Sequence, residues 1–301
     1  MTKVLITGGT GLIGNRLIDR FDDALVTTRN VSAARKKLGD KAKAIQWDSY
    51  NQPLDLSGCG KIDAVINLMG ESIASGRWNA EKKKRILDSR VVGTQRLVEA
   101  ISKLPEKPEC LISASAVGYY GDMGDQEIDE NSSAGTGFLS DVCEQWEAAA
   151  ANAAQYGIRL VYVRIGIVLT PEGGALAEML PIFRKGLGGR LGSGKQYFPW
   201  IHIDDLVGLI HWMVQNPVSG AFNGVAPNSV TNAEFTKTLA SVINRPALFP
   251  VPKFVLKIVV GELANSLFES QRVIPSAALD AGFEFEFKEL QPALVDLLVK
   301  S

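Results

Sequence analysis

Three glycines near the start of the chain have the spacing of a phosphate-binding turn. Gly8, Gly11 and Gly14 follow an apolar run at residues 4–6, and apolar residues recur at helical spacing over residues 12–21. A strand that leads through such a turn into a helix brings backbone N–H groups and the positive end of the helix dipole to an anion. Glycine also lets the backbone approach a pyrophosphate closely. The stretch therefore predicts a dinucleotide site, and the alternative is a plain glycine turn.

Other candidate cofactor contacts follow the first two expected strands. The residues of the turn itself are Gly8, Thr10, Gly11, Leu12, Ile13 and Gly14. Thr28 and Arg29 end the strand expected at residues 24–28. An acidic residue there would accept the ribose 2′-hydroxyl of NAD, whereas an arginine suits the 2′-phosphate of NADP. Arg29 therefore favours NADP, with a solvated strand-end arginine as the alternative.

Three later segments add further candidates. Asp48 ends the next expected strand and either meets the adenine or closes a turn. The apolar run at residues 64–71 is typical of a central parallel strand, whose carboxyl end faces the ligand crevice. Leu68, Met69 and Gly70 are therefore expected to line the cofactor, with core packing as the alternative for Met69. Arg90, in the basic helical segment that follows, is a candidate phosphate partner.

Composition narrows the class of protein. The chain has 301 residues, enough for about two domains, and 32 basic against 33 acidic residues give a net charge of −1. This balance argues against a nucleic-acid or membrane surface, so we expect a small-molecule partner. Cys59, Cys110 and Cys143 are widely separated and lie far from both histidines, which predicts neither disulfides nor a metal site. No apolar run reaches the length of a membrane span, and a cytoplasmic, reducing compartment fits best.

The middle of the chain resembles a known superfamily. A serine-rich strand end at residues 113–116 precedes the run Tyr119-Tyr120-Gly121. Together with the glycine turn, this resembles the extended short-chain dehydrogenase/reductases, in the NAD-dependent epimerase/dehydratase branch. Shorter motifs at residues 67–71, 76–78, 89–91 and 224–227 are similar to a subfamily labelled epimerase family protein, which carries a C-terminal domain of unknown function. The resemblance implies that Val168, in a strand beside the nicotinamide, contacts the cofactor.

The catalytic pair of that superfamily is missing from this chain. Its general acid/base is a tyrosine followed four residues later by a lysine that lowers the tyrosine pKa from about 10. The counterparts here are Leu139 and Cys143, and a cysteine among apolar residues is more often a buried hydrophobe than a nucleophile. The resemblance leaves Ser115 to bind a substrate carbonyl. Tyr119 and Tyr120 are the nearest replacements for the acid, although one of them is expected in the core.

The expected architecture is α/β, a doubly wound parallel sheet (Rossmann) with a smaller C-terminal α/β substrate domain. Residues 1–170 form the NADP-binding domain, and residues 171–301 form the substrate-binding domain, with segments near 198–226 returning to the first. The glycine-rich residues 186–194 are expected to be a mobile loop over the site. Phenylalanines alternate with glutamates over residues 283–287, which predicts a half-buried strand rather than an aromatic binding box.

Two functions remain open at this point. The first is an NADP(H)-dependent reductase or nucleotide-sugar epimerase acting on a small polar, sugar-like substrate. Its proton would come from Tyr119, Tyr120, Glu71 or a water ordered by Ser115. The second is a non-catalytic NADP(H)-binding sensor whose output is a protein interaction. The missing tyrosine and lysine favour the sensor, whereas the retained serine and the full substrate domain favour the enzyme, and the sequence leaves the oligomeric state open.

Overall fold

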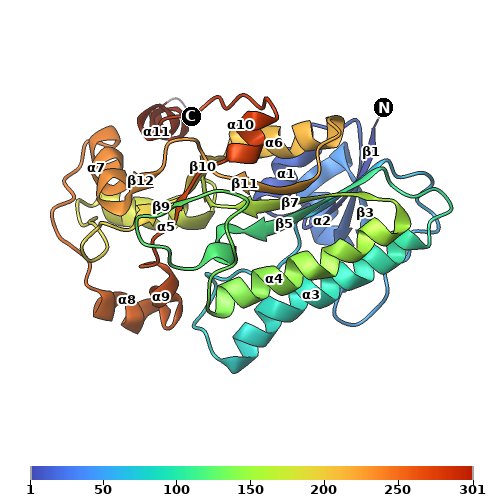
Figure 1. Cartoon of the computed structure of the whole chain (residues 1–301), viewed down its shortest axis with the longest axis horizontal. Coiled ribbons are helices and arrows are strands. Elements are labelled where there is room, and N and C mark those ends of the chain that lie inside the picture. The colour runs from blue at the N-terminus through green and yellow to red at the C-terminus, as the bar shows by residue number, and fades with distance from the viewer. Residues whose placement is uncertain (1, 300–301) are drawn as a thin grey trace.

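A seven-stranded parallel sheet forms the centre of the molecule. The structure is a computed structural model and describes residues 2–299, apart from the side chains of Val259 and Val260. The strand order is β3-β2-β1-β4-β5-β7-β11, so the chain winds outward from β1 in both directions (Figure 1). The strands are β1 Lys3–Thr7, β2 Asp23–Thr28, β3 Lys43–Gln46, β4 Ala64–Asn67, β5 Cys110–Ala116, β7 Arg159–Ile165 and β11 Gly220–Gly224. The doubly wound parallel sheet expected from the sequence is confirmed.

The central strands are apolar on both faces because helices cover both faces. In β1, Val4 and Ile6 belong to one hydrophobic cluster, and Leu5 between them belongs to another. The first cluster includes residues of the helices α1 Leu12–Ile18, α2 Val31–Leu38 and α6 Ile203–Gln215. The second includes residues of α3 Ala80–Ser102 and α4 Phe138–Ala151. Short 3-10 turns lie at Gly39–Lys41, Val117–Tyr120 and Asn152–Tyr156.

The C-terminal part is built from short helices and three two-stranded sheets. Its helices are α5 Gly174–Arg184, α7 Asn232–Val242, α8 Lys253–Val260, α9 Leu263–Ser266, α10 Ser276–Asp280 and α11 Leu290–Val299. The strand pairs are β8 Ile167–Leu169 with β10 Trp200–His202, β9 Tyr197–Phe198 with β12 Val230–Thr231, and β6 Glu127–Ile128 with β13 Arg272–Val273. β11 pairs with β7, so the chain returns to the main sheet after α6.

The prediction of a strand at residues 283–287 is wrong, because this segment pairs with no strand in the described part of the chain. Phe285 is buried and Glu284 and Glu286 are exposed, so the alternation that suggested a strand is present. The backbone N–H groups of Glu286 and Phe287 donate instead to the carboxylate of Asp205, at 2.8 and 2.9 Å. The Asp205 carboxylate thus accepts the backbone hydrogen bonds that a neighbouring strand would accept in a sheet.

Candidate functional site

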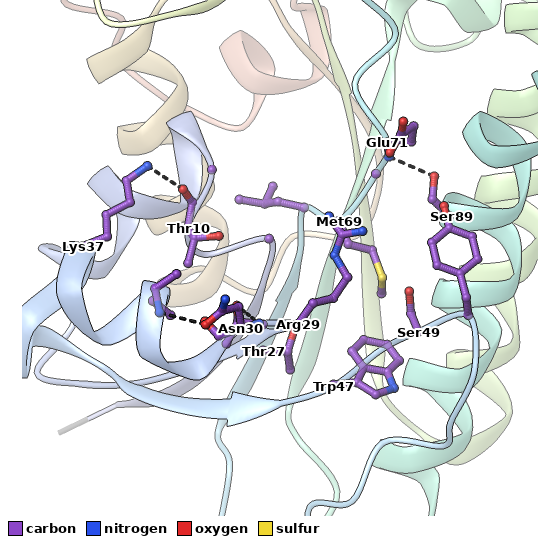
Figure 2. A pocket seen from close by; sticks show the side chains of 18 residues that line it. Thr10, Thr27, Arg29, Asn30, Lys37, Trp47, Ser49, Met69, Glu71 and Ser89 are labelled. Atoms are coloured by element: carbon purple, nitrogen blue, oxygen red, sulfur yellow. Dashed lines mark hydrogen bonds between the residues drawn. The ribbon is translucent and has the colours of Figure 1, made fainter. Parts of the chain in front are cut away.

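A cavity lies at the carboxyl ends of β1, β2 and β4. Its volume is about 540 Å³, and it is lined by Gly8, Thr10, Gly11, Thr27, Thr28, Arg29, Asn30, Ala33, Ala34, Lys37, Trp47, Ser49, Tyr50, Leu68, Met69, Gly70, Glu71 and Ser89. Figure 2 shows Arg29 and Met69 in its middle, with Thr10 and Lys37 on one side and Ser49 and Ser89 on the other. We call it the glycine-turn cavity. Eight of the residues expected to contact a cofactor line it: Gly8, Thr10, Gly11, Thr28, Arg29, Leu68, Met69 and Gly70.

The positions of Gly8, Gly11 and Gly14 in the turn differ in how strongly the surrounding structure requires a glycine there. Gly8 has φ +70°, and a Cβ there would lie 2.7 Å from the carbonyl oxygen of Leu68. A Cβ on Gly14 would lie 2.6 Å from the carbonyl oxygen of Gly8, so Gly14 is needed for packing the helix on the turn. At Gly11 the one atom within 4 Å of such a Cβ is that same oxygen, at 3.0 Å. Gly8 and Gly11 both line the cavity, and Gly11 is the less constrained of the two by the fold.

Two cations, Arg29 and Lys37, are among the residues that line the glycine-turn cavity. Arg29 is exposed and makes no hydrogen bond or ion pair among the described residues. Lys37 donates from Nζ to the carbonyl oxygen of Thr10 at 2.7 Å. Between them, Asn30 caps α2 by accepting from the N–H of Ala33 at 2.9 Å. A guanidinium and an ammonium that line one cavity suit an anionic group such as a phosphate.

Lys37 was not among the residues expected from the sequence to contact a cofactor, although its spacing from Asn30 indicates that it faces the cavity. Asn30, Ala33, Ala34 and Lys37 all line the cavity, and their spacing is that of one helix face. Once Asn30 is taken as a helix cap directly after Arg29, positions three, four and seven residues later face the same side. The contribution of Trp47, Ser49 and Tyr50 had no comparable signal, because the loop after β3 has no periodic pattern.

Six expected contacts do not line this cavity. Leu12, Ile13 and Gly14 lie in the first turn of α1, and Val168 lies in β8. Asp48 accepts from the N–H of Tyr50 at 3.0 Å and from the amide of Asn51 at 2.7 Å, and the hydrogen bond from Asn51 lowers its pKa. It forms a turn, one of the two alternatives expected for it.

Arg90 also lies outside the cavity, on the far side of Gly70. Its Nη1 donates to the carbonyl oxygens of Glu71 and Ile86, both at 3.1 Å, and its guanidinium lies 5.0 Å from the centre of the Trp146 ring. A Cβ on Gly70 would lie 2.9 Å from that guanidinium. In this arrangement Arg90 supports the backbone that lines the cavity and is not itself among the lining residues.

A buried polar network fixes the ends of the strands beneath the cavity. Thr7 donates to the Asn67 side-chain oxygen at 2.7 Å, and the Asn67 amide donates to Thr94 at 2.9 Å and Ser113 at 3.2 Å. The indole of Trp146 donates to Thr94 at 3.1 Å. These bonds join β1, β4, β5, α3 and α4. They hold the backbone of residues 68–70 at the edge of the cavity.

The expected catalytic residues Ser115, Tyr119 and Tyr120 lie in and after β5 and do not line the glycine-turn cavity. Ser115 is 2 % exposed, and its Oγ has no hydrogen-bond partner among the described residues. Tyr120 is fully buried, donates to Asn223 at 2.8 Å and accepts from Arg164 at 3.0 Å. Burial raises the pKa of Tyr120 to about 12, which disfavours proton transfer near neutral pH.

Tyr119 is half-buried beside a buried ion pair. The guanidinium of Arg164 lies 3.6 Å from the centre of the Tyr119 ring and donates twice to Glu147 on α4, both at 2.9 Å. Glu71 accepts from Lys82 at 2.8 Å, and this bond lowers the Glu71 pKa. A carboxyl group with a lowered pKa remains ionised near neutral pH and is a poor proton donor.

The two residues at the positions of the missing pair are apolar in character here. Leu139 packs with its Cβ 3.2 Å from where a Cβ on Gly118 would stand. Cys143 is 3 % exposed, and burial raises its thiol pKa to about 11. The thiol is therefore protonated and unsuited to nucleophilic attack. Cys59, Cys110 and Cys143 are all buried and free of disulfides.

A second cavity, of about 200 Å³, lies between the start of α4 and the C-terminal part. It is lined by Trp78, Lys83, Gly118, Gly121, Thr136, Gly137, Phe138, Leu139, Ser140, Glu262, Asn265, Ser266 and Glu269. We call it the interdomain cavity. Lys83 on its rim and Ser89 in the glycine-turn cavity both belong to α3, six residues and about 9 Å apart along the helix axis. The loop of residues 186–194 contributes to neither cavity.

The interdomain cavity combines aromatic walls with charged groups. The rings of Trp78 and Phe138 pack edge to face, and Lys83 lies 5.3 Å from the centre of the Phe138 ring while pairing with Glu262. Burial raises the pKa of Glu269, and the nearby Asp122 adds to the shift. Of the carboxyl groups that line the two cavities, Glu269 is therefore the one shifted toward its protonated form. No motif or periodic pattern in the sequence indicates a role for Glu269.

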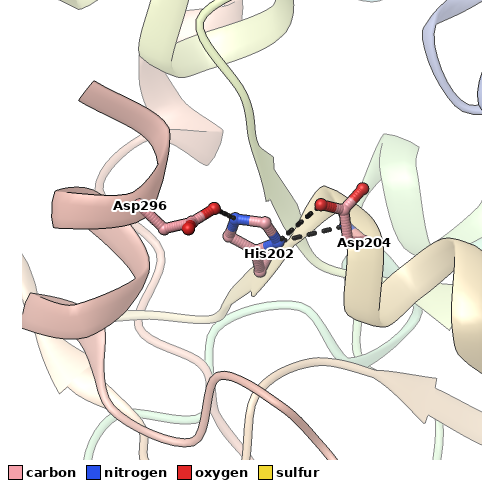
Figure 3. Close-up of side chains that lie close together, drawn as sticks. All are labelled: His202, Asp204 and Asp296. Carbon is pink, nitrogen blue, oxygen red and sulfur yellow. Dashed lines mark hydrogen bonds and ion pairs between the residues drawn. The ribbon is translucent and has the colours of Figure 1, made fainter. Parts of the chain in front are cut away.

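One cluster of potential metal ligands occurs among residues 2–299, away from both cavities. It comprises His202, Asp204 and Asp296, with the imidazole between the two carboxylates (Figure 3). Nδ1 of His202 accepts from the N–H of Asp204 at 3.1 Å, so the proton of the neutral ring is on Nε2, which lies 3.6 Å from the Asp296 carboxylate. Neither ring nitrogen then offers a lone pair to a metal. We interpret the cluster as a structural contact between α6 and α11.

The parallel sheet, the glycine turn and the cavity at the strand ends together define a dinucleotide-binding protein of the short-chain dehydrogenase/reductase type. The model of the NAD dependent epimerase/dehydratase family matches residues 4–225, and a model described as a domain of unknown function matches residues 251–297. The chain belongs to the NAD dependent epimerase/dehydratase family. Both parts of the resemblance seen in the sequence are confirmed.

The relatives specify the branch. An epimerase family protein from Arabidopsis thaliana, SDR39U1 homolog, chloroplastic, is 42% identical over 97% of this chain and 85% of the relative. The crystal structure of the human epimerase family protein SDR39U1 with NADPH is 38% identical, with a TM-score of 0.88 over 98% of this chain and 99% of that chain. A UDP-glucose 4-epimerase from Thermotoga maritima is 17% identical with a TM-score of 0.79, over 97% of each chain, which shows the fold alone.

None of the helices in the described chain is long and apolar enough to cross a membrane.

Proposed function

We propose that the protein is an NADP(H)-dependent reductase or epimerase that acts on a small hydroxylated carbonyl compound. The observation that carries the cofactor choice is the pair Arg29 and Lys37 in the lining of the glycine-turn cavity. Human SDR39U1, crystallised with NADPH, supports the same choice. An acid in place of Arg29 would repel the 2′-phosphate, and the one carboxylate among the lining residues, Glu71, is paired with Lys82.

The residues present fit the cofactor. Gly8 and Gly11 leave room for a pyrophosphate beside the start of α1, and Leu68 to Gly70 supply an apolar wall at the strand ends. Arg29 and Lys37 would hold the 2′-phosphate, and Thr28 the ribose. Leu12, Ile13 and Gly14 would serve through their backbone, Val168 would lie beside the nicotinamide, and Asp48 would keep the loop after β3 closed. When bound, the cofactor supplies hydride transfer.

The interdomain cavity is the proposed substrate site. Trp78 and Phe138 offer flat apolar faces, and Asn265, Ser266 and Thr136 offer polar groups, which together suit a sugar-like molecule with both C–H and O–H surfaces. Glu269, with its raised pKa, would donate the proton that the missing tyrosine cannot. Ser115 is 2 % exposed and lines neither cavity, so its hydrogen bond to the reacting oxygen requires the side chains that cover it to move. The substrate-binding role of residues 171–301 is part of this proposal.

Turnover of a panel of aldoses, ketoses and nucleotide sugars, with NADPH oxidation followed by absorbance and epimer formation by NMR, tests the proposal. Glu269→Gln should lower kcat about a hundredfold and leave the NADPH affinity unchanged, because it removes only the proton donor. Ser115→Ala should lower kcat by a similar factor. The matched control is Glu262→Gln, which lies in the same cavity but is exposed and paired with Lys83. A kcat that is the same in the wild type and Glu269→Gln would refute the role of Glu269.

A specific observation supports the second function, a non-catalytic NADP(H) sensor. Leu139 occupies the position of the superfamily tyrosine and packs against Gly118, so no hydroxyl reaches that place. If NADPH binds, nothing in the panel turns over, and NADPH changes the affinity for a protein partner in a pull-down, the sensor function replaces the enzyme function.

A further inference from the structure

A surface of the C-terminal part exposes an unusual number of large apolar side chains. Five of them are at least 60 % exposed: Leu187 60 %, Leu248 76 %, Phe249 64 %, Phe254 67 % and Ile258 69 %. Two belong to α8, Leu187 lies on the loop between α5 and β9, and Leu248 and Phe249 lie on the loop between α7 and α8. Scattered exposed apolar residues are normal, whereas a contiguous group marks an interaction surface. The question is whether these residues lie together.

Backbone contacts place the two segments side by side. The N–H of Val251 donates to the carbonyl oxygen of Arg190 at 2.8 Å, and the N–H of Gly192 donates to Val251 at 2.9 Å. The guanidinium of Arg245 donates to the carbonyl oxygen of Arg184 at 3.0 Å. A shallow cavity of about 270 Å³ between the segments is lined by Arg190, Lys237 and Leu248, among others. The segment with Leu187 therefore lies beside the segment with Leu248 and Phe249, and α8, with Phe254 and Ile258, follows that second segment directly in the chain.

The two segments that form this face carry an excess of cations, with Glu269 near Lys253 as a neighbouring acid. Residues 182–195 contain Arg184, Lys185, Arg190 and Lys195, residues 237–260 contain Lys237, Arg245, Lys253 and Lys257, and neither segment contains an acidic residue. All eight cations are exposed, and none makes an ion pair with a described residue. The net charge of −1 conceals this local excess. We call the two segments together the basic apolar face. They lie at the end of the molecule that carries α7 and α8, opposite the end with α2 and β3 (Figure 1).

The charge distribution distinguishes between possible occupants. A two-fold dimer through this face would bring two identical sets of cations together, which is repulsive. A protein partner of the usual kind is also disfavoured, because protein interfaces are depleted in lysine, and five of these eight cations are lysines. Lysines and arginines that surround protruding apolar side chains, with an amphipathic helix among them, are typical of surfaces that bind anionic lipids.

We propose that the basic apolar face binds peripherally to the surface of a membrane that contains anionic lipids. Phe254 and Ile258 of α8, with Leu248 and Phe249, enter the interface between headgroups and acyl chains, and the surrounding cations contact the lipid phosphates. Binding is peripheral, since no helix of the described chain is long and apolar enough to span a bilayer. The residues that line the glycine-turn cavity all lie between positions 8 and 89, so none of them belongs to the basic apolar face.

Sedimentation of the full chain with lipid vesicles tests the proposal. The protein should sediment with phosphatidylcholine vesicles that contain phosphatidylglycerol, should remain in solution with pure phosphatidylcholine, and should dissociate as salt is added. Lys253→Glu with Lys257→Glu should weaken binding about 25-fold or more, since each lysine contributes about fivefold. Phe254→Ser with Ile258→Ser should also abolish sedimentation. The lipid and salt series uses the wild type alone, so it remains decisive if a variant misfolds.

The matched control is Lys43→Glu with Lys288→Glu. Both residues are exposed, make no ion pair among the described residues and lie outside the basic apolar face. The control should bind anionic vesicles like the wild type. Equal binding to neutral and anionic vesicles, or unchanged binding after charge reversal on α8, would overturn the proposal. So would a dimer in solution that Phe254→Ser with Ile258→Ser splits, because the face would then be an interface between copies.

Discussion

Gly11 and Gly14 belong to one turn but respond differently to a side chain. Gly11 lines the glycine-turn cavity, and a Cβ there meets a single oxygen at 3.0 Å, whereas a Cβ on Gly14 meets two backbone atoms at 2.6 Å. Gly11→Val should therefore keep the fold and fill the space needed by the pyrophosphate. Gly14→Val should separate α1 from the turn and lower the stability itself. Circular dichroism with NADPH titration separates the two effects, and a native Gly11→Val protein with wild-type NADPH affinity would place the phosphates elsewhere.

Arg29 and Lys37 are expected to set the preference for NADPH over NADH. A charge-assisted hydrogen bond to a phosphate contributes about 1.5 to 3 kcal/mol, or roughly ten- to hundredfold in affinity. Arg29→Ala should lose about that factor for NADPH and leave NADH binding nearly unchanged, and Lys37→Ala should do the same more weakly, because Lys37 also bonds Thr10. Lys36→Ala, on the neighbouring exposed position of α2, is the control. Calorimetry that finds equal affinities for the two cofactors in the wild type would refute the assignment.

At this scale, the residues that could be predicted from the sequence are those fixed by local spacing. The glycines and Arg29 follow from their distance along a strand, a turn and a helix. Lys83 and Glu269 could not be predicted as neighbours, because 186 residues separate them and only the packing of α9 brings them to one cavity. Ser115 was expected from a motif, but its burial depends on how closely α4 packs on β5.

The contact between the start of α6 and the C-terminal helix should make stability sensitive to acid. Burial lowers the pKa of His202 from 6.5, against the opposing effects of Asp204 and Asp296, and Arg16 lowers it further. The folded protein then binds fewer protons than the unfolded chain below pH 6.5, so the free energy of unfolding falls as the pH falls. Asn at position 202 keeps an acceptor for the Asp204 N–H, and His202→Asn should flatten this dependence. Urea unfolding at a series of pH values measures it.

The second histidine provides the comparison. Burial also lowers the pKa of His211, with a further contribution from Arg20, so His211→Asn should flatten the same region of the profile. The double variant should remove both contributions. A His202→Asn protein whose stability depends on pH as steeply as the wild type would show that His202 is not neutral in the folded state.

The strands and helices could be predicted from the sequence where a hydrophobic pattern is compatible with a single kind of packing. The buried parallel strands are continuous apolar runs because helices cover both faces, and the sequence shows this directly. The segment 283–287 has the alternation of a strand, but its backbone is satisfied by Asp205, about 80 residues earlier. The apolar run at residues 254–267 forms two helices and not one, because Gly261, with φ +69°, separates α8 from α9.

One hydrophobic cluster runs from the first strand to the last helix. Val4 and Ile6 of β1 and Leu290, Leu294 and Leu297 of α11 all belong to it. Leu294→Ala should lower the free energy of unfolding by about 2 to 5 kcal/mol, since Leu294 is fully buried. The loss of NADPH binding and the loss of helical signal should shift together. Val299→Ala, on the same helix but 63 % exposed, should change neither. Separate transitions would show that the C-terminal part unfolds independently.

The whole-molecule arrangement could be predicted only in part. The order of the seven strands follows from parallel βαβ connections and the glycine turn after β1. The positions of α7 to α11 could not be deduced, because these helices are short and joined by irregular segments. The basic apolar face was hidden for another reason. A net charge of −1 averages over the chain, and the excess of cations appears only when two segments are brought together.

The three buried cysteines can serve as native probes of local unfolding. Cys110 lies in the central strand β5, Cys143 on α4 and Cys59 in a turn between β3 and β4. An alkylating reagent reacts with a thiol only while the surrounding structure is open, so the three labelling rates are three local opening equilibria. Cys59, in a loop, should be modified first, and Cys110 only with global unfolding. Mass spectrometry of the labelled peptides would then resolve, without any engineered probe, the order in which the protein comes apart.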